Sequence, residues 1–165
     1  MAFGFKLRDV FKPRKEVVEE VGLKSGFQVL DYGCGPGGYV LAVAEAIGAS
    51  GKLYALDINP VALEMVQKII AKNKFENVET ILSDCATSLP DETLDAILLY
   101  DVFHGLSEPN VVMKELCRVL KAGGVLSFSD HHLNESEITS KVTGSGLFKL
   151  QKKGKVTYTF SKQTA

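Results

Sequence analysis

The sequence predicts an α/β fold with three layers, in which helices cover both faces of a doubly wound, mostly parallel sheet of about seven strands. Apolar runs alternate with segments whose apolar residues recur at helical spacing, which is typical of a parallel sheet with helices between its strands. The last part of the chain differs, because two short runs flank Lys152-Lys153-Gly154 and read as a hairpin. A hairpin must pair antiparallel. We therefore expect the sheet to end with an antiparallel C-terminal hairpin.

The first part of the chain is expected to hold two strand–helix units. The apolar run 27–32 is the first strand, and it ends in a group of glycines. Apolar residues then recur at helical spacing until Gly48, which predicts a helix. The run 52–57 is the second strand. Asn59-Pro60 after it indicates a helix start, because asparagine caps helices and proline suits the first turn.

The alternation continues in the middle of the chain. Strands are expected over 78–82 and 94–100, and the latter is apolar nearly throughout, as a strand buried on both faces should be. We expect Ser107 to cap the following helix and the glycine pair 123–124 to end it. A fifth strand is predicted over 125–129.

One more helix and the hairpin complete the expected fold. Asn134 with Glu137 three residues later matches a capping box, which predicts a helix start. The hairpin strands are expected over 147–151 and 155–160, and the second alternates apolar and polar residues as a half-buried strand does. No linker or internal repeat interrupts the order, so a single domain over residues 1–165 is predicted.

The composition excludes several classes of protein. The chain has 165 residues, and 19 basic against 20 acidic residues give a net charge of −1. A charge near zero argues against a protein that coats nucleic acid or an acidic membrane. Three scattered cysteines without a C-x-x-C pair favour reduced thiols and argue against a zinc ribbon. No membrane span or signal peptide is recognised, and a cytoplasmic protein is expected.

A glycine-rich turn follows the first predicted strand. Four glycines, Gly33, Gly35, Gly37 and Gly38, lie within six residues, whereas one or two would serve a plain turn. Glycine lets a ligand approach the bare backbone, and the next helix begins here with its free N–H groups. The spacing also fits the dinucleotide fingerprint. The turn therefore predicts a site for a polar group and favours an anionic one.

Carboxylates follow three of the predicted strands. Asp57 lies about twenty residues beyond the glycines, where it can accept hydrogen bonds from ribose hydroxyls or simply order the next helix start. Asp84 follows the third strand and can accept from an adenine amine, although a loop carboxylate is common without a ligand. Asp31 precedes the first glycine, where it would repel a pyrophosphate and attract an ammonium group. The residues alone leave a nicotinamide or another adenosine derivative open.

Three segments resemble the class I S-adenosylmethionine (SAM)-dependent methyltransferases. Residues 29–38 are similar to motif I of that family, and residues 55–60 to the acidic motif after its second strand. Residues 115–124 resemble the helix and turn before its fifth strand. The resemblance extends from about residue 21 to residue 130. Within the family, the chain resembles the group that methylates ubiquinone and menaquinone. The resemblance implies a Rossmann-like fold with an antiparallel seventh strand.

The resemblance implies SAM as cofactor, S-adenosylhomocysteine as product, and a set of binding residues. The glycine turn and the acid before it receive the methionine moiety, the acid after the second strand holds the ribose, and the loop after the third strand reads the adenine. Residues after the fourth strand flank the cofactor. The implied cofactor-binding residues are Asp31, Gly33, Gly35, Gly38, Asp57, Ile58, Asp84, Cys85, Ala86 and Tyr100.

All three histidines follow strands whose ends should face the site. His104 comes after the fourth strand, and His131 and His132 after the fifth. A loop histidine is usually solvated, but His104 adjoins the expected methyl group and is the candidate general base or substrate-positioning residue. Asp101 and Asp130 could join His131 and His132 as metal ligands. No metal ion is expected, because these ligands come from two loops.

The expected function is methyl transfer to a small-molecule acceptor by in-line displacement at the sulfonium. Two alternatives stay open: an NAD-dependent oxidoreductase, against which Asp31 and the hairpin count, and a non-catalytic SAM-binding subunit. No Asn-Pro-Pro-Tyr run follows the fourth strand, which argues against a nucleic-acid amino-methyltransferase. A nucleic acid partner is not expected, and a weak contact could begin only at the lysine-rich hairpin.

The acceptor site is the least determined part of this interpretation. The expected core uses nearly the whole chain, so no separate cap domain is predicted. Residues 1–12 contain several large apolar side chains, which could close over the cofactor as a lid or pack on the core. The acceptor site is therefore expected to be open, completed by this segment, or shared with a second subunit in a homodimer.

Overall fold

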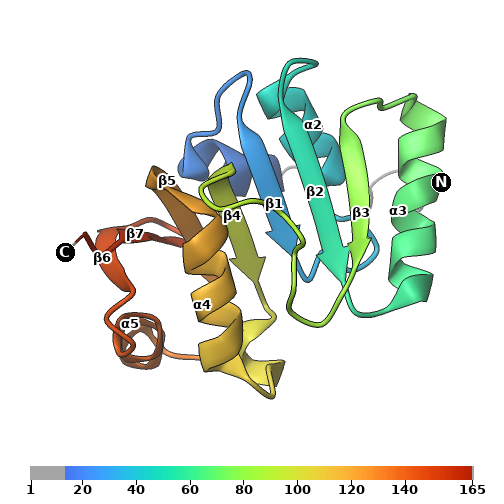
Figure 1. The fold of residues 1–165 in the computed structure, drawn as a ribbon. Coiled ribbons are helices and arrows are strands. Elements are labelled where there is room, and N and C mark those ends of the chain that lie inside the picture. Colours follow the sequence, from blue (N-terminus) through green and yellow to red (C-terminus); the bar gives the residue numbers. More distant parts are fainter. Residues whose placement is uncertain (1–13, 165) are drawn as a thin grey trace, which may run out of the picture.

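The computed structural model describes residues 14–164, and the expected lid or packing segment 1–12 lies outside this range. Its elements, after a helical stretch over residues 14–21, are β1 (Gln28–Tyr32), α2 (Val40–Ile47), β2 (Lys52–Asp57), α3 (Pro60–Asn73), β3 (Val78–Leu82), β4 (Leu94–Tyr100), the 3₁₀ turn η1 (Phe103–Gly105), α4 (Pro109–Val119), β5 (Leu120–Ser129), α5 (Glu135–Thr143), β6 (Phe148–Lys153) and β7 (Tyr158–Lys162). Figure 1 shows a single twisted sheet with helices on both of its faces.

The sheet confirms the predicted fold class. Its seven strands run in the order β3-β2-β1-β4-β5-β7-β6. β1 pairs parallel with both β2 and β4, and β5 pairs parallel with β4. β7 then pairs antiparallel with β5 and with β6. The strand order reverses between β1 and β4, and ligands in such sheets bind beyond the carboxyl ends of the strands at that point.

Two apolar clusters, one on each face, hold the layers together. In β4, Ile97 and Leu99 belong to the cluster that contains the buried side of α4 and α5, whereas Ala96 and Leu98 belong to the cluster under α2, α3 and residues 14–21. All four are fully buried. Because successive side chains of a strand point to opposite faces, a strand covered on both sides must be apolar at every position.

Both expected boundaries of α4 were wrong. The helix begins at Pro109, with Glu108 rather than Ser107 at the N-cap position and no side-chain cap bond. It ends at Val119, and Gly124 lies inside β5. A Cβ on Gly124 would come 2.5 Å from Leu120 Cδ1. Proline at the first helical position was the true start signal, and glycine here permits close packing at the strand irregularity.

Two predicted helix starts are confirmed, and the hairpin is confirmed with a shift. Asn59 Oδ1 accepts from the Val61 amide at 3.0 Å, and Asn134 forms a full capping box with Glu137. β7 begins three residues later than expected, at Tyr158.

A carboxylate from the other end of the chain explains the shift. Glu20 accepts hydrogen bonds from the backbone amides of Lys155, Val156 and Thr157, and from the Thr157 hydroxyl at 2.8 Å. Amides bound to a carboxylate cannot also join the strand ladder.

Candidate functional site

A cleft of about 320 Å³ opens beyond the strand ends where the order reverses. The loops after β1, β2, β3 and β4 supply its walls. Five of the residues predicted for the site line it: Gly33, Asp57, Ile58, Asp84 and His104.

The glycine turn is tied to β2 by backbone hydrogen bonds. The amides of Gly33 and Cys34 both donate to the Leu56 carbonyl, at 2.8 and 2.9 Å. Gly33 has φ +74°, and a Cβ there would lie 2.3 Å from Val102 Cγ2. Gly35 has φ +53° and no atom within 4 Å of a Cβ position. Gly33 is therefore required for packing against the loop after β4, whereas Gly35 leaves open space beside bare backbone.

Asp57 holds two segments of the site together. One carboxylate oxygen accepts from the Gly35 amide and the other from the Asn59 amide, both at 2.8 Å. The side chain therefore orders the glycine turn and the start of α3 while it lines the cleft. This bond to Gly35 was not anticipated from the sequence, because it joins the turn after β1 to the end of β2, 22 residues away.

Asp31 and Gly35, which were also predicted for the site, do not line the cleft, and Asp31 is the most unusual carboxyl group near it. Its side chain is buried, and its Oδ2 has no hydrogen-bond partner among the described residues. Burial, with a further contribution from the charge of Asp57, raises the pKa of Asp31 to about 7. A buried polar atom without a partner is costly, so this carboxyl group is suited to a donor or cation that approaches along the glycine turn.

The loop after β3 is attached to β1 through Tyr32, whose hydroxyl donates to the Asp84 carbonyl at 2.8 Å. The bond places Asp84 on the wall of the cleft. Cys85, whose amide donates to Ser83 Oγ at 3.1 Å, and the exposed Ala86 follow directly, but neither is part of that wall.

Tyr100 and Gly38 serve the packing around the site. The Tyr100 ring is buried against Tyr39, with ring centroids 5.0 Å apart, and its hydroxyl is 2.7 Å from Ser127 Oγ. Gly38 accepts from Arg14 at 3.2 Å. A Cβ on Gly38 would come 2.7 Å from the Arg14 guanidinium carbon. Neither residue lines the cleft.

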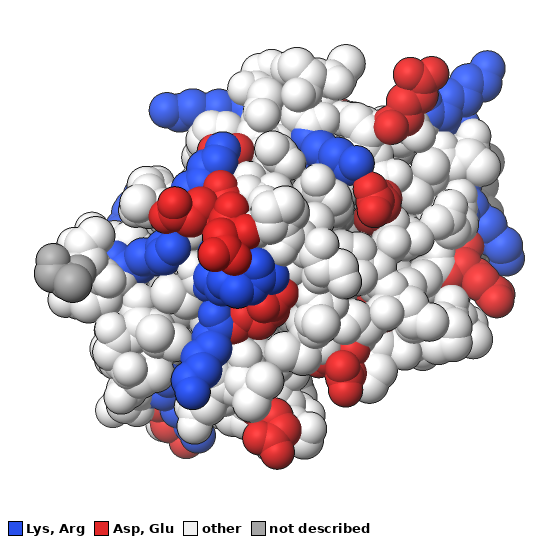
Figure 2. Space-filling model, viewed as in Figure 1, with Lys and Arg blue, Asp and Glu red and all other residues white. Residues whose placement is uncertain are grey.

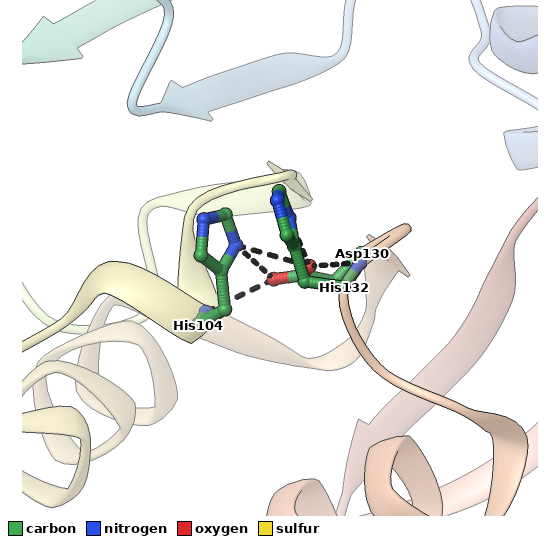
Figure 3. A group of neighbouring side chains, drawn as sticks. All are labelled: His104, Asp130 and His132. Atoms are coloured by element: carbon green, nitrogen blue, oxygen red, sulfur yellow. Dashed lines mark hydrogen bonds and ion pairs between the residues drawn. The ribbon is translucent and has the colours of Figure 1, made fainter.

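His104 and His132 converge on the buried carboxylate of Asp130 (Figure 3). His104 Nδ1 lies 3.0 Å from each oxygen of Asp130, and the His104 amide donates to the same carboxylate at 3.0 Å. The His132 amide donates to it at 3.1 Å. Burial acts to raise the pKa of Asp130, but these hydrogen bonds outweigh it and leave the pKa lowered.

His131 belongs to a separate pair. Both its amide and its Nδ1 bind Asp101 Oδ1, at 2.9 and 2.5 Å. The His132 ring lies between the other two imidazoles, with centroids 3.8 Å from His104 and 4.0 Å from His131. Asp101, Asp130, His131 and His132, which were considered as metal ligands from the sequence, therefore do not form one cluster. Asp101 pairs with His131, whereas Asp130 and His132 lie together with His104.

The lysine-rich hairpin has acidic neighbours. Lys153 forms an ion pair with Glu135, and Lys162 lies 3.6 Å from Glu92. On the face shown in Figure 2, basic and acidic side chains lie beside one another. No helix in residues 14–164 is both long and apolar enough to cross a membrane.

Comparison with known proteins gives two kinds of match. The family model described as a methyltransferase domain matches residues 23–163. The demethylmenaquinone methyltransferase of Anoxybacillus flavithermus is 32% identical over 113 residues, which are 67% of this chain and 47% of the relative. That of Staphylococcus aureus (strain MRSA252) is 31% identical over 68% of this chain and 46% of the relative. The chain spans about half the length of these curated relatives.

Solved structures share the fold over most of the chain. A SAM-dependent methyltransferase from Aquifex aeolicus superposes with a TM-score of 0.80 and 27% identity, covering 92% of this chain and 89% of that one. The [4+2]-cyclase SpnF superposes with a TM-score of 0.73 and 19% identity, covering 86% and 59%. Because a cyclase shares this architecture, the fold by itself does not define the reaction.

Proposed function

The chain belongs to the methyltransferase-domain family, as its sequence motifs predicted, and from that membership we propose that it transfers a methyl group from SAM to a small-molecule acceptor. The observation that carries the proposal is the unpartnered carboxylate oxygen of buried Asp31 beside the glycine turn. A pyrophosphate would be repelled there, whereas the ammonium group of a methionine moiety supplies the missing donor. This favours SAM over a nicotinamide dinucleotide.

The remaining cofactor contacts follow from the glycine turn and from the walls of the cleft. The open space beside Gly35 suits the methionine carboxylate and backbone, and Asp57 has lone pairs left for ribose hydroxyls. Ile58 is 68% exposed at the cleft and offers an apolar surface to the adenine. Asp84 lines the same wall and can accept from the adenine amine. These roles complete the proposed cofactor site.

SAM supplies a methyl group on a sulfonium, which is an excellent leaving centre. The protein therefore has to align the acceptor with the methyl group and exclude water, and orientation of this kind contributes up to about 7–11 kcal/mol in favourable cases. His104 lines the cleft, its Nδ1 lies 3.0 Å from Asp130, and no hydrogen bond within the described residues uses its Nε2. We assign His104 Nε2 to accept the proton of a hydroxyl acceptor as its oxygen attacks.

The cofactor contacts proposed above take up the cleft of about 320 Å³, so the acceptor would lie beside them, next to His104. The choice of acceptor class therefore rests on the relatives. Because curated relatives are demethylmenaquinone methyltransferases, quinol-like aromatic acceptors are the first class to test.

Two further proposals concern the setting of the enzyme. The thiols of Cys34, Cys85 and Cys117 are free, which favours the cytoplasm as compartment.

We also propose that a second copy completes the acceptor side of the cleft in a homodimer. Sedimentation at several protein concentrations tests the dimer, and a monomer under conditions of full activity would contradict it.

Ligand binding by calorimetry tests the proposed cofactor site. S-adenosylhomocysteine should bind, and NAD should not. Asp31→Ala should weaken S-adenosylhomocysteine while leaving 5′-methylthioadenosine, which lacks the amino acid, nearly unaffected. Asp57→Asn should weaken both. Binding of NAD alone would overturn the assignment, and binding of S-adenosylhomocysteine without methyl transfer to any acceptor class would point to a non-catalytic subunit.

A further inference from the structure

We propose that His104, Asp130 and His132 form a binding site for one divalent transition-metal ion, with Zn²⁺ as its representative. The three side chains come from the loops after β4 and β5 and point toward one another (Figure 3). One possible ligand atom from each, two imidazole nitrogens and a carboxylate oxygen, all lie within 4.8 Å of one another. The family match assigns no metal to these residues.

The distances between the ligand atoms agree with the dimensions of a metal site. Asp130 Oδ1 lies 3.0 Å from His104 Nδ1 and 3.5 Å from His132 Nδ1. Two ligands bound to zinc at ~2.0–2.2 Å in tetrahedral geometry are about 3.4 Å apart. An ion could therefore enter with small side-chain rotations.

The carboxylate at the centre is already oriented. Asp130 is only 4% exposed, and the amides of His104 and His132 both donate to it. Hydrogen bonds donated to a side chain that binds a metal fix the orientation of that side chain and tune the affinity of the site for the metal ion. The two imidazoles remain accessible, since the His104 and His132 side chains are 33% and 51% exposed. An ion from solvent can thus reach a site whose anionic member is fixed.

The type of ligand selects the class of ion. Two imidazoles with one carboxylate suit zinc, iron(II), cobalt or nickel, whereas magnesium and calcium prefer oxygen ligands. Three protein ligands also leave at least one coordination position for water or a ligand oxygen. Of the three ligands only His104 lines the cleft, and the ion would bind the side of its ring that faces Asp130.

Occupancy of this site would change what His104 can do, a consequence that depends on the proposed function. An ion on Nδ1 leaves the proton on Nε2, so His104 can then donate a hydrogen bond but cannot accept the acceptor's proton. The same residue would serve proton transfer without the ion and acceptor-oxygen binding with it. The metal-binding test below needs neither cofactor nor acceptor, and its outcome is therefore separate from that of the proposed function.

Direct titration of the metal tests the site. The tag-free full chain, treated with a chelator and dialysed, is titrated with Zn²⁺ by calorimetry and with Co²⁺ by visible absorption. One ion per chain is expected, with the absorption of a nitrogen- and oxygen-ligated cobalt. His132→Ala and His104→Ala should each weaken Zn²⁺ binding by at least about 10–100-fold.

His131→Ala is the matched control. His131 is an exposed neighbour in the same stack of rings, but its Nδ1 and amide are committed to Asp101. This variant should bind Zn²⁺ as the parent chain does, and far-ultraviolet dichroism should show that all three variants are folded. The proposal is overturned if folded parent protein binds no Zn²⁺, if His104→Ala and His132→Ala leave binding unchanged, or if His131→Ala weakens it equally.

Discussion

Two aspartates at the same edge of the sheet are buried to the same degree and behave in opposite ways. Asp31, near the end of β1, is 3% exposed, and Asp130, just after β5, is 4% exposed. The pKa of Asp31 is raised, whereas that of Asp130 is lowered. The difference lies in their partners, because Asp130 receives hydrogen bonds from two backbone amides and an imidazole while Asp31 Oδ2 receives none from the described residues. Burial alone therefore does not determine the state of a carboxyl group; its donors do.

The comparison separates two uses of a buried carboxylate. The carboxylate of Asp130 has all its hydrogen-bond donors within the protein and orients His104, so its role is to position another group. Asp31 Oδ2 has no partner within the described chain and lies beside a glycine turn with open space, so the role proposed for Asp31 requires a ligand.

Replacing His104 should have the largest effect on turnover. If Asp130 holds the imidazole for proton transfer, His104→Ala should lower kcat for a hydroxyl acceptor by about 10²–10⁴-fold with little change in S-adenosylhomocysteine affinity. Steady-state kinetics and calorimetry on the same preparation measure both quantities. His131→Ala serves as the control, and an equal loss in both variants would argue against a specific role for His104.

Replacing Asp31 should reduce cofactor affinity and increase stability. Loss of a buried charged partner costs about 3–5 kcal/mol in comparable pairs, so Asp31→Asn should weaken S-adenosylhomocysteine by about 100-fold or more.

The stability effect of the same variant depends on pH. The folded-state pKa of Asp31 is raised from 3.8 to about 7, so the folded protein holds the proton more tightly and loses stability as pH rises through this interval. Asp31→Asn removes that loss, and without ligand it should be more stable than the parent chain above pH 7, by about 1–4 kcal/mol. Denaturant titrations across this range measure the difference. A variant less stable than the parent at every pH would show that Asp31 is satisfied without ligand.

Asp130→Asn should give the opposite result. An amide cannot accept from every donor around Asp130, so we expect a loss of about 2–3 kcal/mol of stability at neutral pH. Because the folded pKa is lowered, the contribution is present above pH 3.8 and is lost as pH falls below it. Urea unfolding at neutral and acidic pH tests this, and a loss that persists undiminished in acid would contradict the assignment.

Glu20→Gln should have the smallest effect. Glu20 resembles Asp130, because backbone amides surround its carboxylate, but it is only half-buried and solvent screens it. We expect a loss of about 1 kcal/mol and a looser hairpin end, detected as faster amide exchange at Val156 and Thr157. Glu19→Gln on the exposed side of the same helical stretch is the control. Equal effects of the two variants would remove the role given to Glu20.

Local patterns were sufficient for most of the fold. The strands over 52–57, 78–82 and 94–100 and the helix over Val40–Ile47 have the bounds expected from the sequence. Their signals are short-range, since they consist of apolar runs, helical spacing and capping residues. The start of α4 was mistaken because Ser107 was given more weight than Pro109 two residues later.

What the sequence could not provide are the contacts between distant residues. Asp31, Gly33, Asp57 and Asp84 were identified by type and position, because each lies at or just beyond the end of a strand that faces the crevice. The partner of Asp130 is 26 residues away, and the hairpin end depends on Glu20, 135 residues from Lys155. By itself the sequence determined the order of elements, the family and the chemical groups at the sheet edge. Only the tertiary structure decided which of two buried carboxylates is partnered, because hydrogen bonds between loops form only when the sheet brings those loops together.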